Sequence, residues 1–367
     1  MRRGMASRVA AVLCLAFAAG CASGPGAPEV HLFTWDNYDD PELFAEFERR
    51  HGMRVVIDRF ASNEELLAKL MGGTQGYDLI VPSDYMVSIM AREGLLLELD
   101  KTALPNLSHM DPRFMGLYYD RPNRYSVPYL WGVSGIGYDS DEVSPAPEGW
   151  SAFWDPKYKG RMSLLNDQRE VFAMGLQSLG LRADTRDPAD LRKVQRRLKE
   201  QKSLVKTYVS ESMEYLLLSG EVAMAHVWSG DINRAKTEKP SLRFVIPKEG
   251  GFIFQDNLCI PAGARNTAGA LKLMDFLMEP QSVARLVEKV GFGSANRSAC
   301  RSCSSNRLRS EISTIDATTL LPMAVWIGVS PISTANSLPS FRKPNSSRRL
   351  PIDRVWGDLM NPAWCWR

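Results

Sequence analysis

Apolar and polar positions alternate along the chain so that strands and helices are predicted in turn from residue 29 onward. Three apolar runs predict strands: VHLFTW at 30–35, RVVIDRF at 54–60 and YDLIVPSDY at 77–85, the last of which ends in a loop. The segments between them have the spacing of helices that bury one face. Such strand–helix repeats predict an α/β protein with a parallel or mixed sheet and helices on its faces.

Capping residues indicate where the helices between these strands begin and end. Asp40 and Pro41 provide an N-cap and a proline at the first helical position, and Gly52 is suited to stop the same helix. Ser62 and Glu65 form a capping box, which predicts that a second helix begins there.

A second α/β region begins near residue 125. YSVPYLWGVSGIGYD at 125–139 is predicted to cross into it as an extended segment, and helices are predicted at 169–180 and 187–201. The strand GGFIFQDNLCIP at 250–261 follows, and 270–292 has the pattern of two packed helices. Two lobes joined by crossing segments predict a cleft between them.

The ends of the predicted strands collect aromatic and acidic side chains, and ligands of open α/β sheets bind beyond such ends. The candidates are Trp35, Tyr38, Ser83, Tyr85, Asp167, Glu170, Trp228, Asp231, Phe254, Asp256 and Phe292. Most have no basic neighbour in the sequence, although Arg169 lies between two of the acids. Aromatic faces attract cations by about 0.5–2 kcal/mol each, and carboxylates add charge-assisted hydrogen bonds. Together they predict a receptor for alkylammonium groups.

Asp256 is the most informative of these acids because it ends an apolar run. An ionised carboxylate removed from water costs several kcal/mol unless it is paired. The stretch 250–261 contains no Lys or Arg. Its partner must therefore come from elsewhere in the fold or from outside the protein. Cys259, in the same stretch, is expected to be a small buried residue.

Charge is distributed unevenly along the 367 residues, so the formal net charge of +3 is misleading. Residues 1–28 contain three Arg and no acid, and residues 298–367 contain nine Lys or Arg against four acids. This leaves 33 basic and 38 acidic residues in 29–297. A mildly acidic body argues against nucleic acid as a partner and suits a cationic ligand.

The N-terminus predicts export. MRRGMASRV is basic and AAVLCLAFAAG is apolar, as in a signal peptide, and the segment is too short for a permanent membrane anchor. AAGC resembles a lipoprotein processing site, which predicts a signal peptide at 1–21, an acylated Cys21 and a tether at 22–28. The expected location is the periplasm, with a lipid anchor as the membrane contact. Secretion without lipid is the alternative.

Several motifs together resemble the periplasmic spermidine/putrescine-binding proteins of polyamine ABC importers. They are WDNY, YDLIVPSDY, YSVPYLWG, FWDPKYKG, NDQREVF, WSGD, PKEGGFIFQDNLCIP and ALKLMDFLMEP, and they run in order from Val30 to Asn296. The resemblance implies a two-lobed periplasmic-binding-protein fold of type II that closes around its ligand. It implies lobe 1 at 29–131 and 256–297 and lobe 2 at 132–255. The implied function is capture of putrescine or spermidine and delivery to permease subunits, by a monomer without cofactor, metal or enzymatic activity.

The resemblance also assigns roles to the candidate residues. It makes the aromatic side chains and Ser83 the walls of the ligand slot, and it makes Asp167, Glu170 and Asp256 the acids that bind ammonium groups. Phe254 and Phe292 stand where spermidine binders tend to have Trp and Tyr. Asp231 stands where putrescine binders carry an acid. These departures leave the polyamine open, with a preference for putrescine or mixed specificity.

After Asn296 the motifs end and residues 298–367 are rich in Ser and Arg. This atypical tail replaces the C-terminal helices of the family, and a shift of reading frame near codons 297–300 is one hypothesis for it. A product that does not function is then an alternative to transport. Cys300 and Cys303 form CRSC, but a zinc site needs about four ligands and only Cys365 follows.

Other interpretations of the same residues stay open. Asp167 and Glu170 are also placed to favour the N-terminus of the helix that follows them. Trp35 and Trp228 could be core residues, and Asp231 could be a solvated loop acid. A polyamine sensor would use the same site as a transport protein. An exported enzyme on this scaffold is disfavoured, because neither a nucleophile–base pair nor a metal cluster is recognisable.

Overall fold

The structure is a computed structural model that describes residues 27–73 and 76–299 and the backbone of 320–322. The described strands form one mixed sheet in the order β2-β1-β3-β9-β4-β7-β5-β6, with β8 and β10 paired to β4 and β11 paired to β9. The strands are β1 (Glu29–Trp35), β2 (Arg54–Phe60), β3 (Leu79–Ile80), β4 (Ser126–Asp139), β5 (Met162–Leu164), β6 (Thr207–Tyr208), β7 (Met224–Trp228), β8 (Leu242–Val245), β9 (Gly251–Cys259), β10 (Gly293–Ser294) and β11 (Leu320–Pro322).

Helices cover the sheet in two groups. They are α2 (Pro41–His51), α3 (Asn63–Met71), α4 (Asp84–Arg92), α5 (Gln168–Ser178), α6 (Pro188–Gln201), α7 (Glu214–Leu218), α8 (Ser229–Glu238), α9 (Thr267–Leu277) and α10 (Pro280–Val290). Five 3₁₀ turns are also described: η1 (Lys101–Ala103), η2 (Pro105–His109), η3 (Pro112–Phe114), η4 (Trp150–Trp154) and η5 (Pro156–Tyr158). The prediction of an α/β protein is confirmed.

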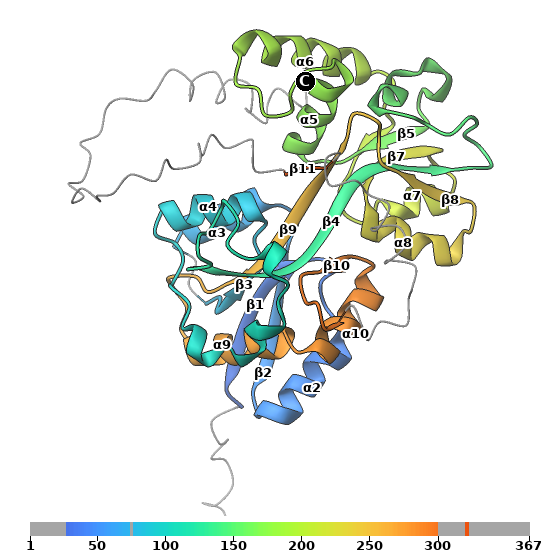
Figure 1. Cartoon of the computed structure of the whole chain (residues 1–367). Helices are drawn as coiled ribbons and strands as arrows, with labels where there is room; N and C mark the ends of the chain where they lie inside the picture. The colour runs from blue at the N-terminus through green and yellow to red at the C-terminus, as the bar shows by residue number, and fades with distance from the viewer. Residues whose placement is uncertain (1–26, 74–75, 300–319, 323–367) are drawn as a thin grey trace, which may run out of the picture.

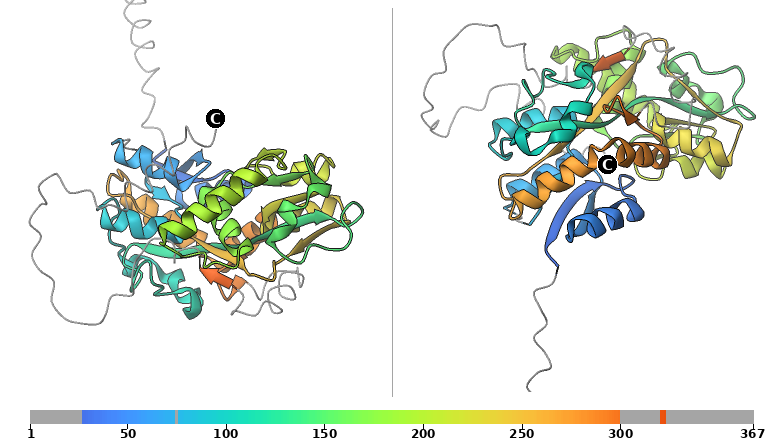
Figure 2. Two further views of the ribbon diagram at one scale, coloured as in Figure 1. Left: turned by 90° about the horizontal axis from the view of Figure 1, so that it is seen from above. Right: turned by 60° about the horizontal axis from the view of Figure 1, so that its bottom comes forward.

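The elements gather into two lobes (Figure 1). Lobe 1 contains β1 to β3 with α2, α3, α4, α9 and α10, and lobe 2 contains β5 to β8 with α5 to α8. The two long antiparallel strands β4 and β9 run through both lobes, and Figure 2 shows β9 passing from one into the other. The lobe boundaries predicted at 131/132 and 255/256 fall inside these two strands, where the chain crosses.

Local sequence explains how the lobe 1 helices begin and end. The Asp40 side chain accepts a hydrogen bond from the backbone N–H of Glu42, and Gly52 ends α2 with a φ of 61°. Ser62 accepts from the N–H of Glu65, while the Glu65 carboxylate accepts from Ala61 rather than from Ser62. The predicted capping box is therefore only partly formed.

The loop predicted after the third strand is present but short, because it covers only residues 81–83 before helix α4 begins at Asp84. Ser83 has extended backbone angles and occupies the N-cap position, and Asp84 opens the first turn. The strand itself is reduced to Leu79 and Ile80. Ser83 and Tyr85 are consequently fixed by a helix N-terminus, and this makes their positions better defined than loop positions would be.

The core extends through both lobes. The buried rings of Phe33 and Phe60 meet edge to face at 4.9 Å in lobe 1, and Trp150 stacks on Phe252 at 5.8 Å in lobe 2. Cys259 is fully buried on β9 as a free thiol, which confirms its expected place.

Candidate ligand-binding site

Asp256 lies on β9 and is held by two hydroxyl groups of lobe 1. Tyr38 Oη donates to Asp256 Oδ2 at 2.7 Å, and Ser83 Oγ donates to Asp256 Oδ1 at 2.6 Å. Asn63 in turn fixes Ser83, because its Nδ2 donates to Ser83 Oγ at 3.0 Å and its Oδ1 accepts from the Ser83 N–H at 3.1 Å. A bridge between the backbones of Ser83 and Asp256 joins the two segments. The carboxylate is thus preorganised by neutral donors.

No ion pair joins Asp256 to a Lys or Arg among the described residues. Only 3% of the residue is exposed, and this burial raises the pKa of its carboxyl to about 7, although Ser83 and Tyr38 oppose the shift. The partner that the sequence left open is therefore not supplied by the described part of the fold. An incoming cation would recover the cost of burying this charge.

An aromatic cluster lies beside Asp256. The rings of Tyr38 and Phe292 are 5.8 Å apart, those of Phe292 and Phe254 are 5.5 Å apart, and Trp228 contacts Phe254 at 6.4 Å. β1 is followed by Tyr38, β7 ends at Trp228, β9 carries Phe254, and Phe292 follows α10. The structure therefore brings together four of the predicted wall residues from distant parts of the sequence.

Trp35 and Tyr85 belong to lobe 1, at the end of β1 and at the start of α4. Trp35 packs on Phe60 at 4.5 Å and is partly buried, and its indole Nε1 is buried without a hydrogen-bond partner among the described residues. Tyr85 is buried at the start of α4, and its hydroxyl donates weakly to Glu64 Oε1 at 3.4 Å. An unpartnered indole N–H is able to donate to an added group.

Asp167 is the N-cap of α5, so the capping role considered from the sequence is present. Its carboxylate accepts from the N–H groups of Arg169 at 2.8 Å and Glu170 at 3.1 Å. Burial, followed by the nearby charges of Glu170 and Glu64, raises the pKa of Asp167 to about 7. The side chain is partly exposed, and its hydrogen bonds leave it able to accept more.

Glu170 is placed in the interior of lobe 2. Its Oε2 accepts from Ser134 Oγ at 2.7 Å and lies 3.3 Å from His226 Nε2, and neither Glu170 nor His226 is exposed. Its Oε1 is buried without a hydrogen-bond partner among the described residues. Sequence gave no sign of this pairing, because His226 is 56 positions away in the chain.

Asp231 already has a cation. Arg234, one turn further along α8, lies 2.8 Å from Asp231 and 2.8 Å from Glu214, and it donates to the carbonyl of Val290 at 2.7 Å. Burial raises the pKa of Asp231 to about 7, and the guanidinium opposes that shift. This acid is therefore less available to a ligand ammonium than Asp256 is.

Two further acids and one base lie next to predicted site residues, although the sequence analysis did not assign them to the site. Asp84 is buried, accepts from Tyr118 Oη at 2.9 Å, and has a pKa raised by burial to about 6. Glu64 lies at the start of α3, and Arg169 reaches it from lobe 2 at 3.6 Å. Asp84 could have been found, since it follows Ser83 directly, whereas nothing in the local sequence singles out Glu64.

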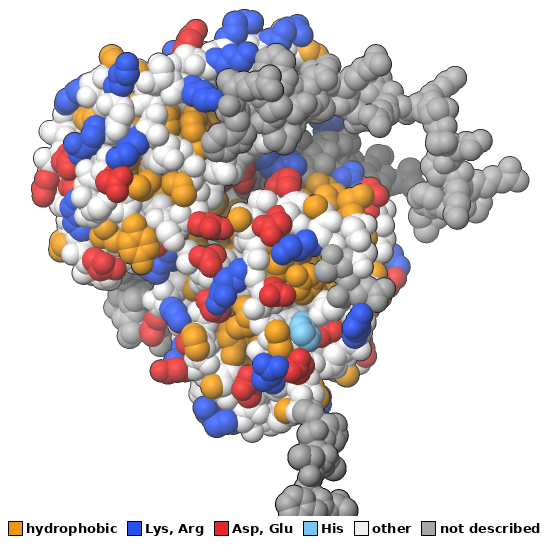
Figure 3. Space-filling view, turned by 180° about the vertical axis from the view of Figure 1, so that it is seen from behind, with side chains coloured by type: hydrophobic (Ala, Val, Ile, Leu, Met, Phe, Trp, Pro, Cys, Tyr) orange, Lys and Arg blue, Asp and Glu red, His pale blue; other side chains and the backbone are white. Residues whose placement is uncertain are grey.

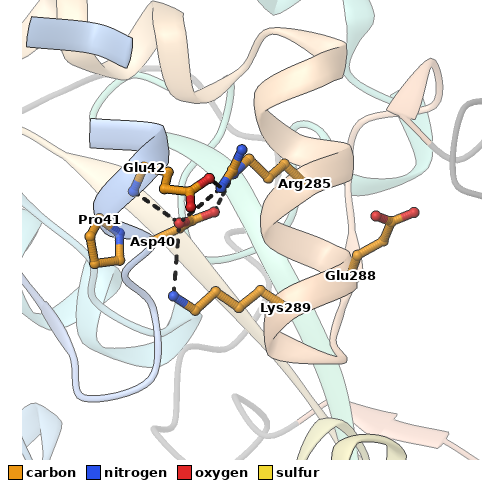
Figure 4. Close-up of a pocket in the computed structure, with 6 residues that line it drawn as sticks. All are labelled: Asp40, Pro41, Glu42, Arg285, Glu288 and Lys289. Atoms are coloured by element: carbon orange, nitrogen blue, oxygen red, sulfur yellow. Dashed lines mark hydrogen bonds and ion pairs between the residues drawn. The ribbon is translucent and has the colours of Figure 1, made fainter. Parts of the chain in front are cut away.

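Acidic side chains gather where the two lobes meet. Figure 3 shows this on the face opposite to that of Figure 1, with apolar and basic side chains beside them. A separate surface pocket of lobe 1, between the start of α2 and α10, has a different character (Figure 4). There Arg285 pairs with both Asp40 and Glu42, and Lys289 lies 3.8 Å from Asp40. Because its acids have resident partners, that pocket is a poorer site for an amine.

Among the described residues, no cluster of three or more His, Cys, Asp or Glu is arranged to hold a metal ion. None of the helices in those residues has the length and apolar character needed to span a membrane. Two predictions fall on residues whose side chains the structure does not describe. They are the acylation of Cys21 and the hypotheses about the tail and the CRSC motif, which lie after Ala299.

Known proteins are similar to this chain in sequence and in fold. The spermidine/putrescine-binding periplasmic protein of Escherichia coli is 36% identical over 272 residues, covering 74% of this chain and 78% of the relative. A solved structure from Listeria monocytogenes, assigned to a spermidine/putrescine ABC transporter, has a TM-score of 0.78 and 33% identity, covering 81% of this chain and 93% of that one. The two-lobed periplasmic-binding-protein fold is thereby confirmed.

A putrescine/cadaverine-binding protein of Pseudomonas aeruginosa is 29% identical over 354 residues, which cover 93% of this chain and 96% of the relative. That alignment extends past Asn296, where the motifs recognised in the sequence end. The family model for bacterial extracellular solute-binding proteins matches residues 42–305. The chain therefore belongs to the bacterial extracellular solute-binding protein family.

Proposed function

We propose that this protein captures a polyamine outside the cytoplasmic membrane and delivers it to the permease of an ABC importer. The observation that carries the proposal is Asp256, a buried carboxylate held by Tyr38 and Ser83 and paired with no Lys or Arg of the described residues. The names of the relatives, which bind spermidine, putrescine or cadaverine, support the same ligand class.

In this proposal the ligand lies between the lobes with one ammonium group on Asp256. Tyr38, Trp228, Phe254 and Phe292 enclose its methylene chain, and their faces add cation–π attraction. The second ammonium group reaches the acids of lobe 2. Selectivity then depends on the match between the spacing of the amines and the spacing of the carboxylates.

Asp167 is the lobe 2 acid that we assign to direct contact, because it is partly exposed and lacks a Lys or Arg at ion-pair distance among the described residues. We keep Glu170 in the proposed site because its Oε1 has no hydrogen-bond partner among the described residues and is able to accept one. We do not assign Asp231 to direct contact with the ligand, since its carboxylate is already paired with Arg234. Trp35, Ser83 and Tyr85 complete the lobe 1 wall.

The test is calorimetric titration of the full mature chain with putrescine, spermidine and spermine. 1,4-Butanediol is the matched control, because it has the four-carbon chain of putrescine and no charge. Saturable heat with at least one amine and none with the diol is the expected result. A folded chain, verified by circular dichroism, that binds none of the three amines would remove the proposal.

We also propose that Cys21 carries the lipid anchor. The support is the AAGC motif after the apolar segment. In a bacterial host, the native chain should fractionate with membranes, and Cys21→Ala should release it into the soluble fraction or leave an uncleaved precursor. Equal membrane association of a cleaved Cys21→Ala variant would contradict the anchor.

A further inference from the structure

Arg169 connects the two lobes. It is the second residue of α5 in lobe 2, and its guanidinium carbon lies 4.2 Å from the centroid of the Tyr85 ring in lobe 1. Its Nε lies 3.6 Å from Glu64 Oε1, the oxygen to which Tyr85 Oη donates at 3.4 Å. Figure 1 shows α5 on the side of its lobe that faces α3 and α4, where Glu64 and Tyr85 lie.

The surroundings suit a cation at this place. Burial raises the pKa of both Asp84 and Asp167, and the charge of Arg169 opposes that rise, so Arg169 partly offsets one acid from each lobe. Its side chain is 19% exposed, and Nε is buried without a hydrogen bond to the described residues. Asp167 accepts from the Arg169 N–H and thereby fixes the first turn of α5 that presents the guanidinium.

We propose that Arg169 is a latch between the lobes, which stabilises their closed arrangement by its contacts with Tyr85 and Glu64. Both contacts join residues of different lobes, so they are lost whenever the lobes separate. The latch makes Arg169 a positioning residue: it slows the opening that releases ligand without needing to touch the ligand. Its effect on ligand release rests on the proposed function, whereas its effect on the lobes does not.

The first arm of the test is small-angle X-ray scattering of the full chain without ligand. Arg169→Gln removes the charge and the planar fork, and it should raise the radius of gyration because the open arrangement becomes more populated. Glu64→Gln should shift it in the same direction by less. A radius of gyration for Arg169→Gln equal to that of the native chain would overturn the latch.

The second arm is stopped-flow measurement of putrescine binding and release. One cation–π contact and one partly exposed ion pair predict a dissociation rate about 5–30 times faster for Arg169→Gln, with the association rate changed by less than about threefold. Arg169→Lys keeps the charge without the planar fork, and its dissociation rate should fall between those of the native chain and Arg169→Gln. The double variant with Glu64→Gln should release ligand no faster than Arg169→Gln alone, because the ion pair is shared.

Lys69→Gln is the matched control. Lys69 lies 4.5 Å from the Phe33 ring and 3.2 Å from Glu65, so it makes the same two kinds of contact entirely within lobe 1. It should leave both scattering and release unchanged. Tighter putrescine binding by Arg169→Gln would overturn the latch and make Arg169 a competitor for the ammonium position. If the native chain binds no putrescine, the proposed function fails while the scattering arm still decides the latch.

Discussion

At the scale of a single residue, the buried carboxylate of Asp256 lowers the stability of the fold but favours the binding of a cation. Its burial raises the pKa of the carboxyl to about 7, so keeping it ionised at neutral pH costs folding free energy. Among the described residues no Lys or Arg pairs with this carboxylate, which leaves it ready for an ammonium group. Functional sites commonly retain such unfavourable charges, since the ligand compensates for them.

Asp256→Asn should therefore change stability and binding in opposite directions. A carboxyl whose folded-state pKa is raised contributes most stability below its unfolded pKa and loses that contribution as pH rises through about 7. At pH 8 the neutral amide should stabilise the ligand-free chain by about 1–3 kcal/mol and weaken putrescine binding by about 3–5 kcal/mol. Urea unfolding and calorimetry measure the two effects. Lower stability together with unchanged affinity would show that Asp256 is structural.

Affinity should also fall as pH is lowered from 8 to 5.5. Amines of this type stay charged over that range, with pKa values near that of Lys, about 10.4. Asp256 and Asp167 both take up protons below about 7, and each protonated carboxyl loses its charge attraction. The dissociation constant of putrescine should rise by up to about tenfold per pH unit for each carboxyl. Asp256→Asn should flatten this dependence, and a native affinity that is constant across the range would contradict it.

At the scale of elements, the sequence predicted those features that depend on neighbouring residues. Asp40, Gly52 and Ser62 determine where their helices begin or end, because capping is a local interaction. The short apolar stretch before Ser83 did not reveal that α4 follows, since a strand end and a helix start share the same residue types there. The pairing of β4 with β9 joins positions more than a hundred residues apart, and the hydrophobic pattern alone cannot specify it.

The same limit applies within the site. The position of Asp256 at the end of an apolar run predicted a buried acid that needs a partner. In contrast, the partners of Glu170 and Asp231 depend on which helix and strand faces meet in lobe 2. The resemblance assigned ammonium binding to Asp167, Glu170 and Asp256 alike, and it placed Asp231 where putrescine binders carry an acid. Only packing distinguishes those that have a resident partner from those that do not.

Strand β4 positions the aromatic cluster through a glycine. A Cβ added at Gly132 would lie 2.6 Å from Phe254 Cζ and 2.9 Å from Phe292 Cδ1, closer than packed atoms allow. Gly132→Ala should displace both rings and weaken putrescine binding about tenfold while the chain still folds. Near-ultraviolet circular dichroism and calorimetry measure these effects. Gly263→Ala is the control, because a Cβ there meets nothing within 4 Å, and equal affinities of both variants would exclude this role for Gly132.

At the scale of the molecule, the two lobes can act as a signal only if the ligand distinguishes their open and closed arrangements. A ligand shifts such an equilibrium by no more than its difference in affinity for the two states. Asp256 and Tyr38 lie at the lobe 1 end of the proposed slot, whereas Asp167 and Trp228 belong to lobe 2. A ligand must reach both sets to favour closure.

Butylamine and putrescine separate binding from closure, because they share a four-carbon chain and differ in the second amine. Both should bind Asp256 with one ammonium group, but only putrescine places a second charge near Asp167. Saturating putrescine should therefore lower the radius of gyration of the full chain, and saturating butylamine should change it less. Asp167→Asn should reduce the response to putrescine more than its response to butylamine, since the monoamine leaves that carboxylate unused. Equal contraction with both amines would mean that one end of the slot suffices to close the lobes, and the second carboxylate would then contribute to selectivity alone.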